Sequence, residues 1–332
     1  MAKVFEAFVD AYRGKFVEDH HQISLLAVNP QRETIICAGN PAHKIAMRSS
    51  SKPFQALALF ASGAFEKYNF SLKELALCCA SHEGSQDHIV TAQGILDKIG
   101  LDESYLNCGA HMPSDKASRD HLHETGQKAT PIYNNCSGKH SGMLAVAKAL
   151  GVSPADYEQR DHPVQQLIFK IVSELSGVAD IPYGIDGCSV PTFMLSLEAA
   201  ARMWSSFASP AQYPGYQEGL ETIFRAMHAH PEMLAGEGAN DTEFLRAIPE
   251  LAAKRGAQGY YGLALQDSKF GPLGLTLKVE DGSNEARDVF LIELLEFLGA
   301  LDPETPMPWR KPEIKNHRGI VTGYWQPELK PL

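Results

Sequence analysis

Three short motifs carry the residues of this chain that are best suited to chemistry. They are Ser49-Ser50-Ser51-Lys52, then Ser81-His82-Glu83 after a stretch that predicts a helix, and Lys254-Arg255-Gly256 at the head of a stretch that predicts a strand. A serine hydroxyl needs a nearby base to become a nucleophile at neutral pH, and a desolvated lysine can be that base because burial favours the neutral amine. The order of the motifs is that of a lysine-assisted serine acylase.

The spacing within the first motif supports this chemistry. Ser49 and Lys52 are three residues apart, so on a helix their side chains project from the same face and the amine can reach the hydroxyl. Pro53, Phe54 and Leu57 continue with the periodicity of a buried helix. A run of serines before a proline is also an ordinary helix start, so the accompanying motifs are what favour a catalytic interpretation.

Length and composition limit the class of protein. With 332 residues, 44% of them hydrophobic, the chain can bury a large core as one domain or two intimately joined ones. No apolar run approaches the roughly 20 residues that span a bilayer, and Glu6 and Asp10 interrupt the first apolar stretch, so we expect a cytoplasmic protein without a signal peptide or a membrane partner. The net charge of -10 argues against a nucleic-acid partner, and six cysteines are too few for a disulfide scaffold.

Two of the cysteines lie in polar, glycine-containing turns where packing is a less natural role. Cys136 belongs to the run Asn-Asn-Cys-Ser-Gly-Lys-His at residues 134–140, which opens a helix, and Cys188 belongs to Asp-Gly-Cys-Ser at 186–189, which we place at a loop-to-helix junction. Thiolates are strong zinc ligands, and the third donor would be Lys139 or His140. The alternative is two unrelated reduced thiols, with the helix start binding a substrate carboxylate through its backbone N–H groups.

Strand patterns gather at both ends of the chain. Residues 4–9, 23–28 and 33–38 alternate apolar and polar positions and predict an antiparallel meander, and strands return at 259–265, 274–279 and 319–324. The middle of the chain predicts helices, with a Ser71-x-x-Glu74 capping box.

We expect an α/β (α+β) fold in a single domain over 1–332. One antiparallel sheet is built from both termini and flanked by helices, and the helices of the central segment form a second lobe. The sheet lobe would take about 1–52 and 254–332, and the helical lobe about 53–253.

Taken together, the motifs resemble the L-asparaginase II family of the thermolabile, rhizobial type, which has a serine-β-lactamase-like fold. The resemblance covers nearly the full length. It rests on Arg13-Gly14 with Glu18, Arg48-Ser49 with Lys52-Pro53, Ser81-His82, Cys108-Gly109 with His111 and Pro113, Asn135-Cys136 with Ser137-Gly138-Lys139-His140, Asp186-Gly187-Cys188, Lys254 with Gly256, and Lys278 with Asp281-Gly282.

The resemblance implies hydrolysis of L-asparagine to L-aspartate and ammonia through a serine acyl-enzyme with lysine as the general base. Ser49 and Lys52 would form one serine–lysine pair, with Ser49 as the attacking hydroxyl. Ser81 and Lys254 would form the second pair, in which Ser81 relays a proton to the leaving ammonia.

The same resemblance implies further site residues and partners. One zinc ion, which is not the source of the nucleophile, would be held by Cys136, Lys139 and Cys188. The expected substrate-binding residues are Arg48, His82, Asn135 and Asp186, and the expected assembly is a homodimer.

Two positions depart from the family pattern. The loop Gly236-Glu237-Gly238 continues with Ala239 where an arginine is expected, and Arg255 stands where penicillin-recognising relatives place threonine. The second departure argues against β-lactam chemistry. The competing hypotheses are another serine–lysine acyl hydrolase, of the peptidase or β-lactam-recognising type, and a non-catalytic zinc-binding protein of the same fold. The presence of both serine–lysine pairs argues against the latter.

Overall fold

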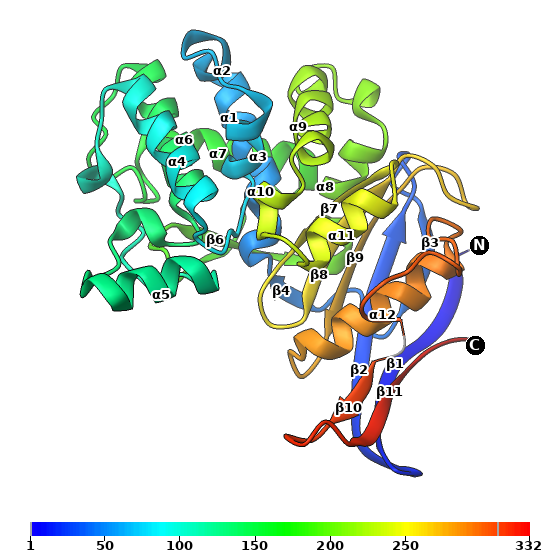
Figure 1. The fold of residues 1–332 in the computed structure, drawn as a ribbon. Coiled ribbons are helices and arrows are strands. Elements are labelled where there is room, and N and C mark those ends of the chain that lie inside the picture. Colours follow the sequence, from blue (N-terminus) through cyan, green and yellow to red (C-terminus); the bar gives the residue numbers. More distant parts are fainter. Residues whose placement is uncertain (1, 311) are drawn as a thin grey trace. The chain divides into compact units, whose positions relative to one another are not determined.

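The computed structural model describes residues 2–310 and 312–332, and these divide into two compact units (Figure 1). The sheet unit comprises the chain up to Ser50, Leu195–Gln212, and the chain from Ala247 onward. The helical unit comprises Ser51–Met194 and Tyr213–Arg246. The sheet unit thus includes a segment, Leu195–Gln212, that we had expected in the helical lobe. None of the helices in the described part of the chain is long and apolar enough to cross a membrane.

The sheet unit is built on eight strands in the order β10-β11-β1-β3-β2-β9-β8-β7. Both ends of the chain contribute, as expected, because β1 pairs antiparallel with β11 from Phe5 opposite Pro331 to Arg13 opposite Gly323. The fold is therefore mixed α/β with a mostly antiparallel sheet. The strands of this unit, including the short β4 outside that order, are β1 (Lys3–Arg13), β2 (Phe16–Val28), β3 (Thr34–Ala38), β4 (Lys44–Ala46), β7 (Leu251–Arg255), β8 (Tyr260–Leu265), β9 (Leu273–Val279), β10 (Glu313–Lys315) and β11 (Val321–Pro331).

The predicted meander at the N-terminus is wrong in its pairing. β1 and β2 form a hairpin only near their turn, from Arg13 opposite Phe16 to Phe8 opposite Gln22. Beyond it the two strands separate and β3 lies between them, parallel to β1 and antiparallel to β2. Ala38 is thereby paired with Phe5 on one side and with Leu25 on the other.

Two helices cover opposite faces of this sheet. On β8, Gly262 faces α8 (Leu197–Ala208), since a Cβ at this position would overlap the Trp204 indole. The neighbouring Tyr261 lies on the other face, where the Arg287 guanidinium of α12 (Asn284–Phe297) stands 6.0 Å from its ring centre. The absence of a side chain at Gly262 is what allows α8 to approach the sheet.

The helical unit is organised around α6, whose first eleven residues, from Ser137 to Ala147, are all buried. It packs against α1, α3, α4 and α7. A helix buried on all sides needs small residues where its neighbours approach, and Gly138 and Gly142 lie against Leu77 and Cys78. The unit contains α1 (Lys52–Ala61), α2 (Ala64–Lys67), α3 (Leu72–Cys78), α4 (Gln86–Ile99), α5 (Lys116–Thr125), α6 (Ser137–Leu150), α7 (Pro163–Ser176), α9 (Gln217–Ala229), α10 (Glu232–Ala235), most of α11 (Asn240–Ala247), β5 (Tyr183–Ile185) and most of β6 (Pro191–Ser196).

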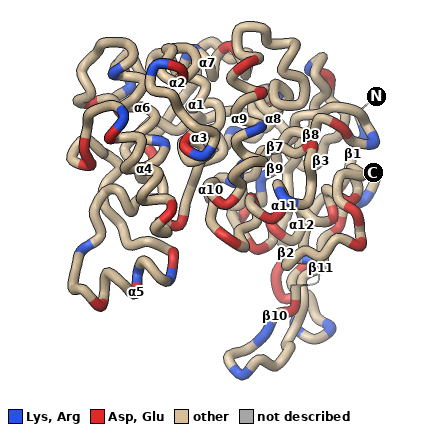
Figure 2. Tube along the Cα trace, turned by 45° about the horizontal axis from the view of Figure 1, so that its top comes forward, with Lys and Arg blue, Asp and Glu red and all other residues tan. Residues whose placement is uncertain are grey.

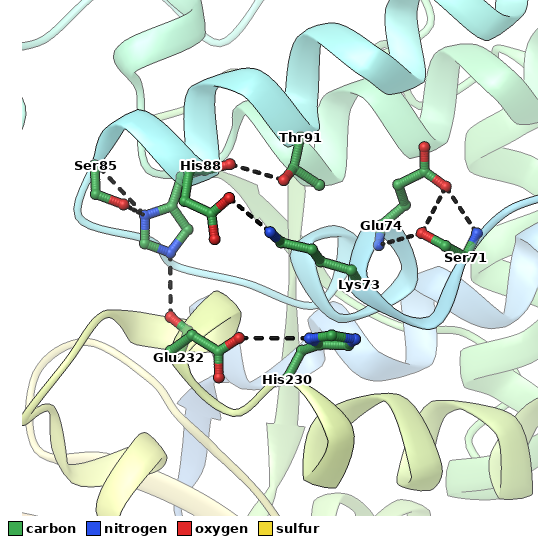
Figure 3. Close-up of polar contacts among 9 residues, drawn as sticks. Ser71, Lys73, Glu74, Ser85, His88, Thr91, His230 and Glu232 are labelled. Carbon is green, nitrogen blue, oxygen red and sulfur yellow. Dashed lines mark hydrogen bonds and ion pairs between the residues drawn. The ribbon is translucent and has the colours of Figure 1, made fainter.

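Local sequence signals explain several helix ends. The predicted capping box at the start of α3 is confirmed: the Ser71 hydroxyl accepts from the Glu74 backbone N–H at 3.2 Å, and the Glu74 carboxylate accepts from the Ser71 N–H at 2.7 Å (Figure 3). α4 ends at Gly100 in the left-handed conformation.

Charged residues are mixed in sign along the chain. Figure 2 shows Lys and Arg interspersed with Asp and Glu along the trace of the described residues, without a long tract of basic residues.

Candidate active site

The Ser49 motif lies at a sharp entry into a helix. Arg48 has a φ of +49°, a left-handed conformation that costs a non-glycine residue roughly 1 kcal/mol. The 3-10 helix η1 (Arg48–Ser51) follows and leads directly into α1, which begins at Lys52 with Pro53 in its first turn. Ser49 is half-buried in η1 and belongs to the sheet unit, whereas Lys52 belongs to the helical unit. Strained backbone of this kind gathers at functional sites.

The amine of Lys52 is buried among polar acceptors. The residue is 2% exposed, and its Nζ lies 2.9 Å from the Ser81 hydroxyl, 2.5 Å from the carbonyl oxygen of Ala80 and 3.2 Å from the Cys136 sulfur. Burying an amine requires that its donors be satisfied, and these three contacts do so. The Lys52–Ser81 pair therefore places a buried amine beside a serine hydroxyl.

Ser81 lies in the irregular stretch between α3 and α4. Its backbone N–H donates to the Leu234 carbonyl at 2.9 Å. The next residue, His82, accepts from the Gly84 N–H at Nδ1, so Nε2 carries the proton and donates to the Ser137 hydroxyl at 2.9 Å. Burial lowers the pKa of His82 well below its usual value, so the ring is neutral. Both ring nitrogens of His82 are engaged within the protein, and the ring fixes the Ser81 loop to the start of α6.

The start of α6 is held close to the same loop. Gly138 has no space for a side chain, because a Cβ would lie 2.5 Å from the Leu77 carbonyl oxygen. Asn134 accepts from the Cys136 N–H at 2.9 Å and donates to the Cys108 carbonyl at 2.9 Å. The half-buried Asn135 receives at its carbonyl the N–H of His82 at 3.2 Å. The predicted opening of a helix by residues 134–140 is confirmed.

Cys188 lies in a hairpin turn, so the predicted loop-to-helix junction is wrong. β5 and β6 pair from Tyr183 opposite Phe193 to Ile185 opposite Pro191, and the helix starts only at Leu197. The turn is closed by the Asp186 N–H donating to the Val190 carbonyl at 2.9 Å. Ser189 has a φ of +75°, a second strained residue beside a candidate site residue.

The two thiols and Lys139 form one buried cluster. Lys139 Nζ lies 3.0 Å from the Cys188 sulfur, and the three residues are each at most 6% exposed. A hydrogen bond between the two thiols raises the pKa of Cys136, and burial raises it further. The same hydrogen bond lowers the pKa of Cys188, and the Lys139 charge also lowers it, although burial acts in the opposite direction. Burial opposes the charged form of Lys139, but the thiol charges and Asp186 outweigh it and raise its pKa. The cluster is thus an ammonium–thiolate pair beside a thiol.

Sequence reasoning did not assign a partner to His140, which lies next to this cluster. Its Nδ1 is 2.5 Å from the Tyr157 hydroxyl, and its Nε2 is buried without a hydrogen-bond partner among the described residues. Burial and the Lys139 charge lower the pKa of His140 to about 4, so it is a neutral imidazole. Tyr157 has no motif around it, and only the folded chain brings it here.

A metal at this cluster would require the lysine amine. Among residues 2–310 and 312–332, no group of three or more His, Cys, Asp or Glu side chains is placed to hold a metal ion. Two sulfur atoms and the amine of Lys139 are nevertheless drawn together, and the unpartnered His140 nitrogen is adjacent in sequence. The residues present are therefore compatible with zinc once Lys139 has lost its proton.

The remaining predicted site residues belong to the sheet unit. Lys254 lies within β7, one residue from its end and opposite Gly262 of β8, so it does not stand at the head of a strand. Its side chain is fully buried. In the helical unit, the structure brings together Lys52, Ser81, Cys136, Lys139 and Cys188, with His82, Asn135 and Asp186 beside them. The pairing of Ser81 with Lys254 and the placing of Arg48 at the substrate stay predictions.

Comparison with solved structures returns glutaminase-like proteins at low similarity. One is a structure of Mglu in its native form, with 14% identity and a TM-score of 0.46 over 82% of this chain, which spans 63% of that protein. Another is a probable glutaminase from Bacillus subtilis complexed with 6-diazo-5-oxo-L-norleucine, with 13% identity and a TM-score of 0.42, covering 84% of this chain and 85% of that one. No curated protein sequence matches the chain.

Comparison with protein families gives a specific result. The sequence model described as L-asparaginase II matches residues 9–327, which includes every residue of the candidate site. The predicted resemblance is confirmed, and the chain belongs to the L-asparaginase II family.

Proposed function

We propose that this protein is an amidohydrolase that converts L-asparagine and water into L-aspartate and ammonia through a serine acyl-enzyme. Membership of the L-asparaginase II family supports an amidohydrolase. The observation that carries the proposal is the buried Lys52 amine 2.9 Å from the Ser81 hydroxyl, three residues after Ser49. A buried amine in contact with a serine hydroxyl can pass a proton during acyl transfer.

The proposed reaction uses both serines in sequence. In this step Lys52 takes the proton of Ser49 as the Ser49 Oγ attacks the carbon of the side-chain amide. The proton then passes through Ser81, over the 2.9 Å contact, to the amide nitrogen as the C–N bond breaks and ammonia leaves. Water then enters, is activated by the same base, and hydrolyses the ester to release L-aspartate.

Substrate recognition in this proposal follows the charges of the amino acid. Arg48 binds the α-carboxylate, and Asn135 and Asp186 contact the polar groups of the substrate. His82 contributes by positioning, because its nitrogens are taken by Gly84 and Ser137.

The zinc ion expected from the family is proposed as a structural and positioning metal. Cys136, Lys139 and Cys188 would hold it, with His140 as the alternative nitrogen donor. A bound zinc would neutralise the thiolate charge and fix the β5–β6 turn against α6. Metal analysis of the purified protein should find about one zinc per chain, and Cys188→Ser should lose it while Cys37→Ser, in β3, keeps it. A metal-free wild type that is active and as stable as before chelation would contradict this assignment.

The experiment that tests the function is ammonia release from L-asparagine, with L-glutamine in parallel. Wild type should hydrolyse L-asparagine, and Ser49→Ala should lose about 10³-fold or more in kcat, as expected for a covalent nucleophile. Ser104→Ala, at an exposed serine in the 3-10 helix Glu103–Tyr105, is the matched control and should be unchanged. A wild type that releases no ammonia would reject the proposal, and labelling by a fluorescent penicillin would then favour the β-lactam-recognising alternative.

A further inference from the structure

A carboxylate two residues after Ser81 has no role in the reaction described above. Glu83 is half-buried in the irregular stretch between α3 and α4, and its backbone carbonyl accepts from the Asp115 N–H at 2.9 Å. Its side chain therefore projects from a segment whose backbone is already fixed.

The Glu83 carboxylate rests directly on the backbone of Gly236. A Cβ at Gly236 would overlap the carboxyl carbon and both oxygens of Glu83, so no other residue fits without displacing the carboxylate. Gly236 has φ of +100° and ψ of 170°, a conformation that is essentially restricted to glycine. Its carbonyl accepts from the hydroxyl of the fully buried Thr242 at 2.7 Å. The backbone of Gly236 is thus a rigid surface against which the Glu83 carboxylate packs.

Two further contacts hold the Glu83 and Gly236 segments side by side. On one side of Glu83, the Ser81 N–H donates to the Leu234 carbonyl at 2.9 Å. On the other side, the buried His88 ring accepts from Ser85 and donates from Nε2 to the Glu232 carbonyl at 3.1 Å, as Figure 3 shows. Glu83 lies between these two contacts in the sequence.

The position and charge of Glu83 match one unmet need of the proposed substrate. L-asparagine carries an α-ammonium group, which binds most strongly to a carboxylate placed for a charged hydrogen bond. Ser81 and Glu83 are two residues apart in the irregular stretch between α3 and α4, and the backbone of each is fixed by a hydrogen bond.

We propose that Glu83, seated on Gly236, binds the α-ammonium group of the substrate and makes the enzyme select α-amino acid amides. This inference rests on the proposed function, because it assigns a residue to the same site. It predicts that the charge of Glu83 matters for substrates that carry an α-amino group and is irrelevant for those that lack it.

The test compares L-asparagine with succinamic acid, which has the same amide and carboxylate but no α-amino group. Wild type, Glu83→Gln and Glu83→Asp are assayed for kcat/KM with both amides. Glu237→Gln is the matched control, because Glu237 is the next residue after Gly236 and its exposed carboxylate pairs with Arg246 at 2.8 Å. Binding of L-aspartate and of succinate is measured by calorimetry on the same proteins.

The expected result is a selective loss. Glu83→Gln should lower kcat/KM for L-asparagine roughly 10- to 100-fold and leave kcat/KM for succinamic acid within about 3-fold of wild type. It should weaken the binding of L-aspartate but not that of succinate. Glu83→Asp should keep more of the preference for L-asparagine over succinamic acid than Glu83→Gln does, and Glu237→Gln should keep all of that preference. Equal losses of kcat/KM with both amides would mean a structural role for Glu83 and overturn the inference. A loss that is selective for L-asparagine in Asp186→Asn but not in Glu83→Gln would also overturn it. If wild type hydrolyses neither amide, the proposed function fails, and the calorimetry alone decides the role of Glu83.

Discussion

At the scale of single residues, the site is defined by how each buried polar group is satisfied. The Lys52 amine contacts Ser81, Ala80 and Cys136, while the Lys139 amine contacts the Cys188 sulfur. The two lysines therefore have different surroundings, one facing a hydroxyl and the other a thiolate. This difference is the physical basis for assigning proton transfer to Lys52 and a positioning or metal-binding role to Lys139.

His82 makes a prediction about pH and stability. Burial lowers the pKa of this ring, so the folded state keeps it neutral while the unfolded chain protonates it near pH 6.5. Its contribution is present above about pH 6.5 and is lost as the pH falls below that value, because the unfolded state then binds more protons. The free energy of unfolding should therefore fall as the pH is lowered from about 6.5 toward 5.

Urea unfolding between pH 8 and pH 5 checks this prediction. Wild type should lose stability across the lower half of the range, and His82→Gln, which keeps a donor and an acceptor but does not titrate, should lose less. His230→Gln, at a partly exposed histidine, is the control. Identical pH dependences of wild type and His82→Gln would contradict the account.

At the scale of secondary-structure elements, the approach of α8 to the sheet depends on the glycine at position 262 of β8. Gly262→Ala should destabilise the protein by about 2 to 3 kcal/mol, because the new methyl group would overlap the Trp204 indole in a closely packed interior. Gly215→Ala is the matched control, since a Cβ there has no heavy atom within 4 Å. Urea unfolding of both variants measures the difference, and a Gly262→Ala protein as stable as wild type would show that α8 can move away freely.

Elements with local signals were predictable from the sequence. The capping box of Ser71, the proline in the first turn of α1 and the glycine that ends α4 all act through contacts within a few residues. The same holds for the helix start at residues 134–140. Motif spacing singled out Lys52 and Ser81 as members of two different serine–lysine pairs, and the 2.9 Å contact between them was not predicted.

Elements decided by distant contacts were not predictable. Pro191–Ser196 has apolar residues at spacings that fit a helix, but pairing with β5 makes it a strand. β3 lies between β1 and β2 because those strands separate beyond Phe8 and Gln22, which no local pattern reveals. The same limit applies to Tyr157 and Glu83, whose partners His140 and Gly236 are remote in sequence.

At the scale of the whole molecule, the chain consists of two compact units with the serine–lysine motifs divided between them. The helical unit holds Lys52 and Ser81, and the sheet unit holds Ser49 and Lys254. The boundary falls between Ser50 and Ser51, within η1. A mechanism that uses both serines therefore depends on the intact chain, and the isolated units are expected to be inactive.

The expected homodimer is a prediction at this scale. The ends of β2 and β11 carry exposed apolar side chains, with Phe16 at 68% and Val321 at 49% exposure, and both strands pair with Arg13 or its neighbours on β1. Apolar groups gathered at a strand end favour association of copies. Light scattering should give twice the chain mass, and Phe16→Glu should lower it toward one chain, with Val90→Glu, on α4, as the control. A monomeric wild type would contradict the prediction.

The central claim is that Ser49 forms a covalent acyl-enzyme with the substrate, using Lys52 as its base. The most direct measurement is mass spectrometry of the protein after incubation with the diazoketone analogue of L-asparagine, followed by mapping of the modified peptide. One adduct per chain is expected on Ser49, absent in Ser49→Ala and Lys52→Met and still formed, more slowly, in Ser81→Ala. An adduct on Ser81 in the wild type, or none on any serine of an enzyme that hydrolyses L-asparagine, would contradict it.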